Sequence, residues 1–124
     1  MNKKIRILVN DLKVEAELNE SETAQLVWEA LPMEAKANRW GEEIYFAIPV
    51  KMGLEKGSRE VVSAGELGYW PTGHAFCIFF GPTPASRGDE IRAASAVNII
   101  GKVSGDPKLF LKIKEGSKVT IERT

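Results

Sequence analysis

The fold is decided by the stretch GELGYWPTGHAFCIFFGP, residues 65–82. Its second half contains six consecutive apolar residues, Ala75–Phe80, and Gly81 and Pro82 end this run. A strand with one wet face alternates apolar and polar residues, whereas a continuous apolar strand is covered on both faces or lines a groove. The middle of the chain therefore predicts a strand of the second kind.

Upstream of this stretch, the first part of the chain has the period-two alternation of half-buried strands. Residues 5–9 and 14–18 place most of their apolar side chains on one face, and Lys13 and Glu15 fall on the other. The Asn10-Asp11 turn between the two segments completes the pattern. The sequence therefore predicts a β-hairpin with one wet face.

The apolar spacing then changes to the i, i+3, i+4, i+7 pattern of an amphipathic helix. Its apolar stripe consists of Ala24, Val27, Trp28 and Leu31. Asn19 or Ser21 can cap the start of this helix, and Pro32 stops it. We expect one helix here, packed against a sheet.

Strand patterns return after the helix, separated by loops. The further strands are predicted at residues 35–40, 43–48, 61–62, 75–80, 97–103 and 119–121, and the strand at 61–62 leads into residues 65–71. Gly41 makes a tight turn between the first two of these, and residues 51–60 and 83–94 have the glycine, proline and polar content of loops.

A second, short helix is predicted near the C-terminus. Asp106 caps its start, Pro107 opens it, and Gly116 closes it as a left-handed C-cap. Its inward residues are expected to be Leu109, Phe110 and Ile113. About eight short strands and two helices predict a mainly β fold, a closed eight-stranded barrel with the two short helices capping its ends.

Composition restricts the classes of partner. The 124 residues predict a single domain, residues 1–124, and 44% of them are hydrophobic, as in a folded globular protein. The 17 basic and 17 acidic residues cancel, whereas proteins that bind nucleic acid or anionic membranes usually carry a basic excess. We therefore expect neither nucleic acid nor membrane as a partner.

The cysteine content and the apolar segments of the sequence predict the compartment of the protein. The single cysteine, Cys77, excludes an internal disulfide and suggests that the protein does not occupy an oxidising compartment. No apolar run approaches the ~18 residues of a membrane span, and Ile7-Leu8-Val9 is too short for the core of a signal peptide. The sequence therefore predicts a cytoplasmic protein.

Several kinds of chemistry are poorly supported by the residues present. His74 and Cys77 are three positions apart, so on one strand they point to opposite faces and cannot form a catalytic pair. The chain lacks the His and Cys clusters that zinc or iron takes, and its glycine segments lack the context of a phosphate loop. We expect no metal and no cofactor.

Two motifs point to a known family: residues 40–46, WGEEIYF, and residues 65–84, from GELGYWPTG to FFGPTP. They resemble an uncharacterised prokaryotic cyclophilin-like family. Residues 97–103 and the following Lys114-Glu115-Gly116 resemble the late strand and helix of cyclophilins, and residues 21–26 resemble the opening of their first helix. The resemblance covers nearly the whole chain and implies the eight-stranded closed barrel capped by two helices, with no settled activity.

The resemblance to cyclophilins also supplies a candidate catalytic residue. Their catalytic segment has an arginine followed by a phenylalanine and a glutamine, and Arg39 stands in the corresponding region. No glutamine follows it, since the only one, Gln25, lies in the first predicted helix. A fixed guanidinium over an apolar slot could donate to the prolyl nitrogen during isomerisation. The alternative is that Arg39 is an ordinary exposed arginine in a hairpin.

The aromatic residues carry the strongest remaining signal, because eight of the ten lie between residues 40 and 80. Phe46 fills the core with one set from Phe76 and Phe80. Other aromatic residues would lie outside, as a surface or cleft that binds something, unless the 83–94 loop or a second subunit covers them. The outward aromatic residues are predicted to be Tyr45, Tyr69, Trp70 and Phe79.

Polar residues beside these aromatics complete the predicted binding site. Glu42 or Glu43 could orient a partner such as Arg39 or a tyrosine hydroxyl, and Asn98 could contact a ligand amide or satisfy a loop backbone. The candidate ligand-binding residues are Trp40, Glu43, Tyr45, Tyr69, Trp70, Phe79 and Asn98.

Three functions follow from these residues. The first is binding of a peptide segment or small molecule in an aromatic groove, without catalysis. The second is a divergent peptidyl-prolyl cis-trans isomerase that uses Arg39. The third is a protein-interaction subunit, with a homo-oligomer as one form of it. The sequence leaves open whether the chain is an enzyme.

Overall fold

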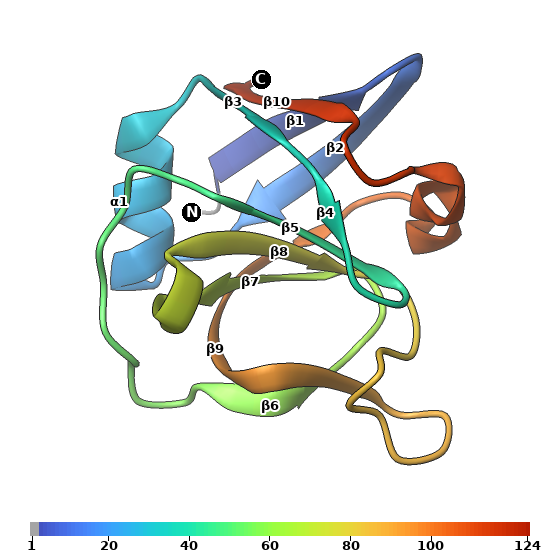
Figure 1. Ribbon diagram of the computed structural model, residues 1–124. Coiled ribbons are helices and arrows are strands. Elements are labelled where there is room, and N and C mark those ends of the chain that lie inside the picture. Colours follow the sequence, from blue (N-terminus) through green and yellow to red (C-terminus); the bar gives the residue numbers. More distant parts are fainter. Residues whose placement is uncertain (1–2) are drawn as a thin grey trace.

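The computed structural model describes residues 3–124 and is mainly β (Figure 1); residues 1 and 2 of the predicted domain lie outside the described part. The strands are β1 (Lys3–Val9), β2 (Leu12–Leu18), β3 (Met33–Lys36), β4 (Asn38–Arg39), β5 (Glu43–Ala47), β6 (Arg59–Val62), β7 (Glu66–Trp70), β8 (Ala75–Phe79), β9 (Ile91–Val103) and β10 (Lys118–Arg123). The helices are α1 (Glu22–Ala30) and two 3₁₀ helices, η1 (Pro71–Gly73) and η2 (Pro107–Lys112). Within residues 3–124, no helix is long and apolar enough to cross a membrane.

The strands pair in the order β3-β10-β1-β2-β9-β7-β8-β5-β4, and β6 pairs with β9 outside this path. The described ladders form an open path of nine strands, and β6 brings the sheet to ten, so the predicted closed eight-stranded barrel is not confirmed. The path begins and ends on neighbouring parts of the chain, because only Ala37 separates β3 from β4. Ala37 bonds through its backbone to Ser117 and Gly116. The strand predicted at 35–40 thus changes partner there, from β10 to β5.

The main core lies on the inner face of this curved sheet and beneath α1. The alternation predicted for the first hairpin is confirmed, since Ile5, Ile7 and Val9 are completely buried and β1 pairs with β2 in register. Ser21 is the N-cap of α1 and accepts a hydrogen bond from the Ala24 backbone. The helix therefore begins where its capping residue predicts.

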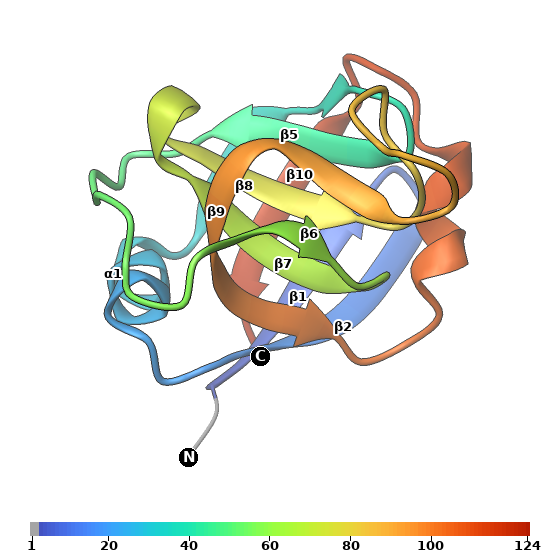
Figure 2. The ribbon, with the colours of Figure 1, turned by 90° about the horizontal axis from the view of Figure 1, so that it is seen from below.

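A second, smaller cluster covers the outer face of β5, β8 and β7, and we call it the outer cluster. Its buried members are Val62, Ala75, Cys77, Phe79, Ile91, Ala93 and Val97, with Tyr45, Trp70 and Ile99 packed against them. Figure 2 shows β6 and the first half of β9 crossing over β7 and β8. Every residue of β8 is consequently buried, as its continuous apolar sequence predicts.

Three predictions about the later part of the chain are wrong. The loop predicted at 83–94 ends early, because β9 already begins at Ile91 and runs for 13 residues. The C-terminal helix is a 3₁₀ helix that ends at Lys112, so Gly116 does not cap it; Gly116 instead donates its backbone N–H to Ala37. The tighter 3₁₀ turn leaves Leu109 40% exposed, while Phe110 and Ile113 are buried.

Candidate functional site

A pocket of about 190 Å³ opens within the outer cluster. It is lined by Trp40, Glu43, Tyr45, Trp70, Cys77, Ala93, Ala94 and Val97. These residues come from the β4–β5 turn and from four strands, β5, β7, β8 and β9. Drug-sized ligands occupy pockets of roughly 300–1,000 Å³, so this one suits a smaller group.

The walls of the pocket are aromatic. The rings of Tyr45 and Trp70 stand at 80° to each other with their centroids 6.2 Å apart. The indole of Trp70 is held by a hydrogen bond of 2.6 Å from its Nε1 to the Ser95 hydroxyl. Trp40 is the third aromatic lining residue, and all three side chains are half-buried. All three rings are therefore accessible to solvent, and the Trp70 ring is also fixed in position.

The β4–β5 turn places Trp40 and Glu43 beside one another. Trp40 donates its backbone N–H to the Glu43 carbonyl over 3.0 Å. Gly41 has a φ of +62°, and a Cβ there would lie 2.8 Å from Thr83 Cα and from Pro84 Cδ. Only glycine lets the turn close this tightly against the 82–84 segment.

Glu43 is the unusual polar group of the pocket, because it is only 5% exposed. Burial raises its pKa from the ordinary 4.5 to about 7, and a contact with the Cys77 thiol opposes this rise. No lysine, arginine or histidine lines the pocket, and Glu43 makes no salt bridge within residues 3–124. A buried carboxyl is normally paired or neutral, so Glu43 changes its charge near neutral pH.

Cys77 lies beside this carboxyl and is also buried. Burial, and then the negative charge of Glu43, raise the pKa of its thiol well above the ordinary value. The thiol therefore stays protonated, which does not suit a nucleophile. His74 is exposed, in a left-handed conformation after η1. Within the described residues, no group of three His, Cys, Asp or Glu side chains could hold a metal ion.

Four of the seven predicted ligand-binding residues, Trp40, Glu43, Tyr45 and Trp70, lie together in the pocket. Phe79 is completely buried in the outer cluster but does not line the cavity. The outward position predicted for Tyr69 is wrong: its ring is in the main core, and its hydroxyl donates to the Val50 carbonyl over 2.6 Å.

Asn98 is 2% exposed and holds a loop, the second of the two roles considered for it. Its amide nitrogen donates to the Gly53 carbonyl and to the Thr23 hydroxyl, and its amide oxygen accepts from the Glu55 backbone. These bonds attach the 53–55 segment to α1. The side chain therefore has a structural role and does not line the aromatic pocket.

The guanidinium of Arg39 is bound to backbone oxygens. Its Nη1 donates to the carbonyls of Leu111 and Ile113 over 2.9 and 2.7 Å, and its Nε donates to the Gly41 carbonyl over 2.6 Å. The same group lies 5.0 Å from the centre of the Phe80 ring. Arg39 is thus a half-buried connection between β4 and η2, rather than an ordinary exposed arginine.

Four lining residues were not among the predicted ligand-binding residues. Ala93 and Ala94 lie in a segment predicted as loop, and Val97 was assigned only to a strand face. Cys77 was predicted to be a small buried residue, which it is. The signal that could have placed Cys77 in the pocket is the pairing register of β8 with its two neighbouring strands. In this register, Cys77 lies opposite Tyr45 of β5 and Gly68 of β7.

Comparisons with known proteins agree with the fold. A family model described as cyclophilin-like matches residues 3–122. The chain is similar to the solution structure of a hypothetical protein from Archaeoglobus fulgidus, with 40% sequence identity and a TM-score of 0.83, over 99% of this chain and 95% of that chain. No curated protein matches the chain. The resemblance carried by residues 40–46 and 65–84 is confirmed, and the chain belongs to the cyclophilin-like family.

Proposed function

We propose that this protein binds a small molecule, or one side chain of a peptide segment, in the aromatic pocket. The observation that carries the proposal is the pocket itself, in which three half-buried aromatic rings surround a buried carboxyl. Aromatic walls with a few convergent polar groups are typical of ligand sites. The volume of about 190 Å³ limits the bound group to a small one.

Prolyl isomerisation receives less support from these contacts. It needs a donor aimed at the prolyl nitrogen, and the predicted donor, Arg39, already donates to three backbone carbonyls. Among residues 3–124, none with a positive charge lines the pocket to replace it. Binding without isomerisation is therefore the function that we propose.

A role as an interaction subunit through an aromatic face also receives less support. Tyr69 and Phe79 are completely buried, and β6 with the first half of β9 lies over the outer face of β7 and β8 (Figure 2). The exposed large apolar residues of the described chain are aliphatic: Leu54, Val61, Leu109 and Leu111.

The test is an NMR titration of the ¹⁵N-labelled protein with a library of small neutral and charged compounds and with proline-containing peptides. We expect shifts grouped on Tyr45, Trp70 and Val97, without accelerated cis–trans exchange of the peptides. Trp70→Ala should weaken binding at least about tenfold, because it removes one wall. Trp28→Ala is the matched control, since Trp28 packs under Arg123 away from the pocket. No shifts in the pocket with any compound would disprove the proposal.

A further inference from the structure

We propose that the ligand is an alkylated organic cation, such as a trimethylammonium group, held between the aromatic rings and paired with the carboxylate of Glu43. This inference rests on the proposed function and names the class of ligand. It comes from two features of the pocket taken together, the arrangement of its rings and the charge at its base.

The rings form adjoining walls of a cage. A cation is attracted to the face of an aromatic ring within about 6 Å of its centre, and tryptophan is the best of the three aromatic side chains for this contact. Because Tyr45 and Trp70 stand nearly perpendicular, a small group beside both can contact them from two directions. Trp40 lines the same cavity and supplies a further indole.

The charge of Glu43 requires a partner. Burying an ionised carboxylate without a cation is costly, and the group then stays protonated instead. The pKa of about 7 agrees with this, because burial is its main cause. A bound cation would supply the missing partner and lower the pKa, whereas a neutral ligand would leave the carboxyl as it is.

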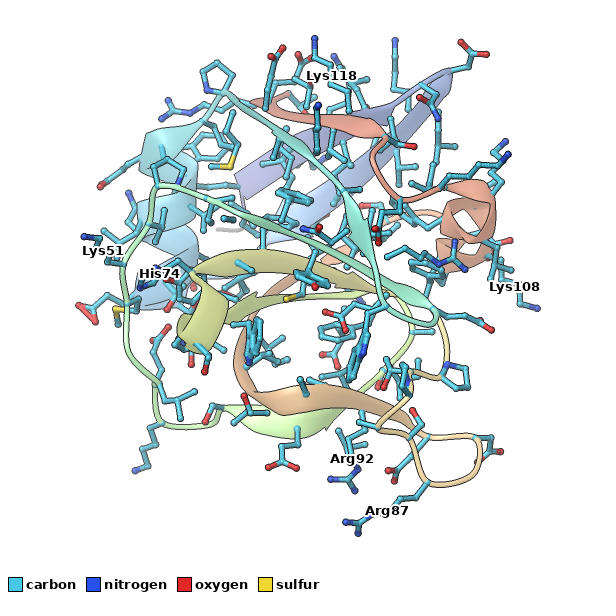
Figure 3. The ribbon with its side chains drawn as sticks, viewed as in Figure 1. Lys51, His74, Arg87, Arg92, Lys108 and Lys118 are labelled. Atoms are coloured by element: carbon cyan, nitrogen blue, oxygen red, sulfur yellow. The ribbon has the colours of Figure 1, made fainter. Side chains whose placement is uncertain are left out.

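The arginines of two surrounding strands, β9 and β4, are occupied elsewhere. On β9, Arg92 pairs with Glu60 and Glu90, and its side chain points away from the body of the molecule (Figure 3). On β4, Arg39 is bound to the η2 carbonyls.

Acidic groups on the other neighbouring elements also lie outside the cavity. On β7, Glu66 pairs with Arg59. In the β4–β5 turn, the Glu42 side chain occupies the space that a side chain at Gly81 would need. On β8, the thiol of Cys77 is the titratable group beside Glu43, and its raised pKa keeps it neutral.

The residues that line the pocket indicate how fully the nitrogen of the ligand is alkylated. A primary ammonium has three N–H donors that need acceptors when water is removed. The lining offers one carboxyl among mostly apolar surfaces. A fully methylated nitrogen has no donors to satisfy and presents methyl groups to the rings, so the pocket favours it over a bare ammonium.

The test compares choline with its neutral isostere, 3,3-dimethylbutan-1-ol, by NMR titration at pH 8. We expect choline to bind at least about tenfold more tightly. Glu43→Gln should reduce this preference to the part that the rings contribute, and Glu42→Gln, the matched control on the neighbouring residue, should retain it in full. A short peptide with trimethyllysine distinguishes the two sources of the cation: tighter binding than choline indicates a protein side chain, and weaker binding indicates a free small molecule.

The pH dependence provides a second measurement. The affinity for choline should fall by up to about tenfold from pH 8 to pH 6, because Glu43 becomes protonated, and the affinity for the isostere should not change. Equal binding of choline and the isostere would overturn the cation inference and leave the proposed function standing. If neither binds, the cation inference is overturned, and the compound library then decides whether the pocket binds any ligand.

Discussion

The main core and the outer cluster lie on opposite faces of the same three strands, β5, β8 and β7, and they differ in how polar groups are accommodated. On the inner face, the hydroxyl of Tyr69 has a backbone partner and the rings of Phe46 and Phe76 stack with centroids 5.3 Å apart. On the outer face, the Glu43 carboxyl is buried without a cation beside a cavity. One face is arranged for stability, and the other keeps a buried carboxyl that has no salt-bridge partner within residues 3–124 and that a cationic ligand could pair with.

The largest expected effect comes from truncating the inner face. Phe76→Ala should reduce the free energy of unfolding by about 3–5 kcal/mol, because it leaves a cavity against Phe46 in a fully packed region. Phe79→Ala is its counterpart on the outer face of β8. Its loss of unfolding free energy should lie at the lower end of that range, since β6 and the start of β9 can move inward to fill the cavity. Urea unfolding of both variants measures the difference. A greater loss for Phe79→Ala would contradict this ranking of the two faces.

The second prediction concerns the charge on the outer face. The pKa of Glu43 is raised in the folded state, so the folded carboxyl keeps its proton between about pH 4.5 and pH 7 while the unfolded one loses it. Its stabilising contribution is complete below pH 4.5 and is lost as the pH rises through 7. The unfolding free energy of Glu43→Gln should therefore equal that of the wild type at pH 4 and exceed it by about 3 kcal/mol at pH 8.

Urea unfolding at several pH values tests this prediction. Glu42→Gln is the control, because it changes the same functional group on a residue outside the pocket. A Glu43→Gln variant that is destabilised equally at pH 4 and pH 8 would mean that the carboxyl is needed for packing. A pH-dependent gain would mean that stability is lower in the wild type because a charged group is kept in the pocket.

The inner face was largely predictable from the sequence, because its signals are local. Ser21 and the apolar spacing after it define α1, and the alternation in residues 5–9 defines the buried side of β1. The sequence also indicates that Tyr69 and Trp70 cannot both face outward, since neighbouring residues on a strand point to opposite faces. Trp70 lines the pocket, so Tyr69 must face the core.

The covering of the outer face was not predictable in the same way. Ala93, Ala94 and Ser95 have weak strand preferences or none, and the sequence around them is typical of a loop. They lie in β9 because β6 pairs with residues on both sides of them, Arg92 and Val97, which is a contact between distant parts of the chain. The pocket depends on that pairing. Its aromatic walls could therefore be identified from the sequence, but the side formed by β9 could not.

The smallest expected effect tests whether polar groups of the inner face are as fully satisfied as the contacts indicate. Tyr69→Phe removes one hydroxyl, keeps the ring, and leaves the Val50 carbonyl without its 2.6 Å partner. An unpaired buried acceptor costs about 1–3 kcal/mol, and we expect a loss near 1–2 kcal/mol, independent of pH between 5 and 8. Phe46→Tyr, which adds a hydroxyl to another completely buried ring, is the complementary variant and should also destabilise the fold. If Tyr69→Phe had no effect while choline affinity fell, Tyr69 would belong functionally to the pocket, and the division between the two faces would be wrong.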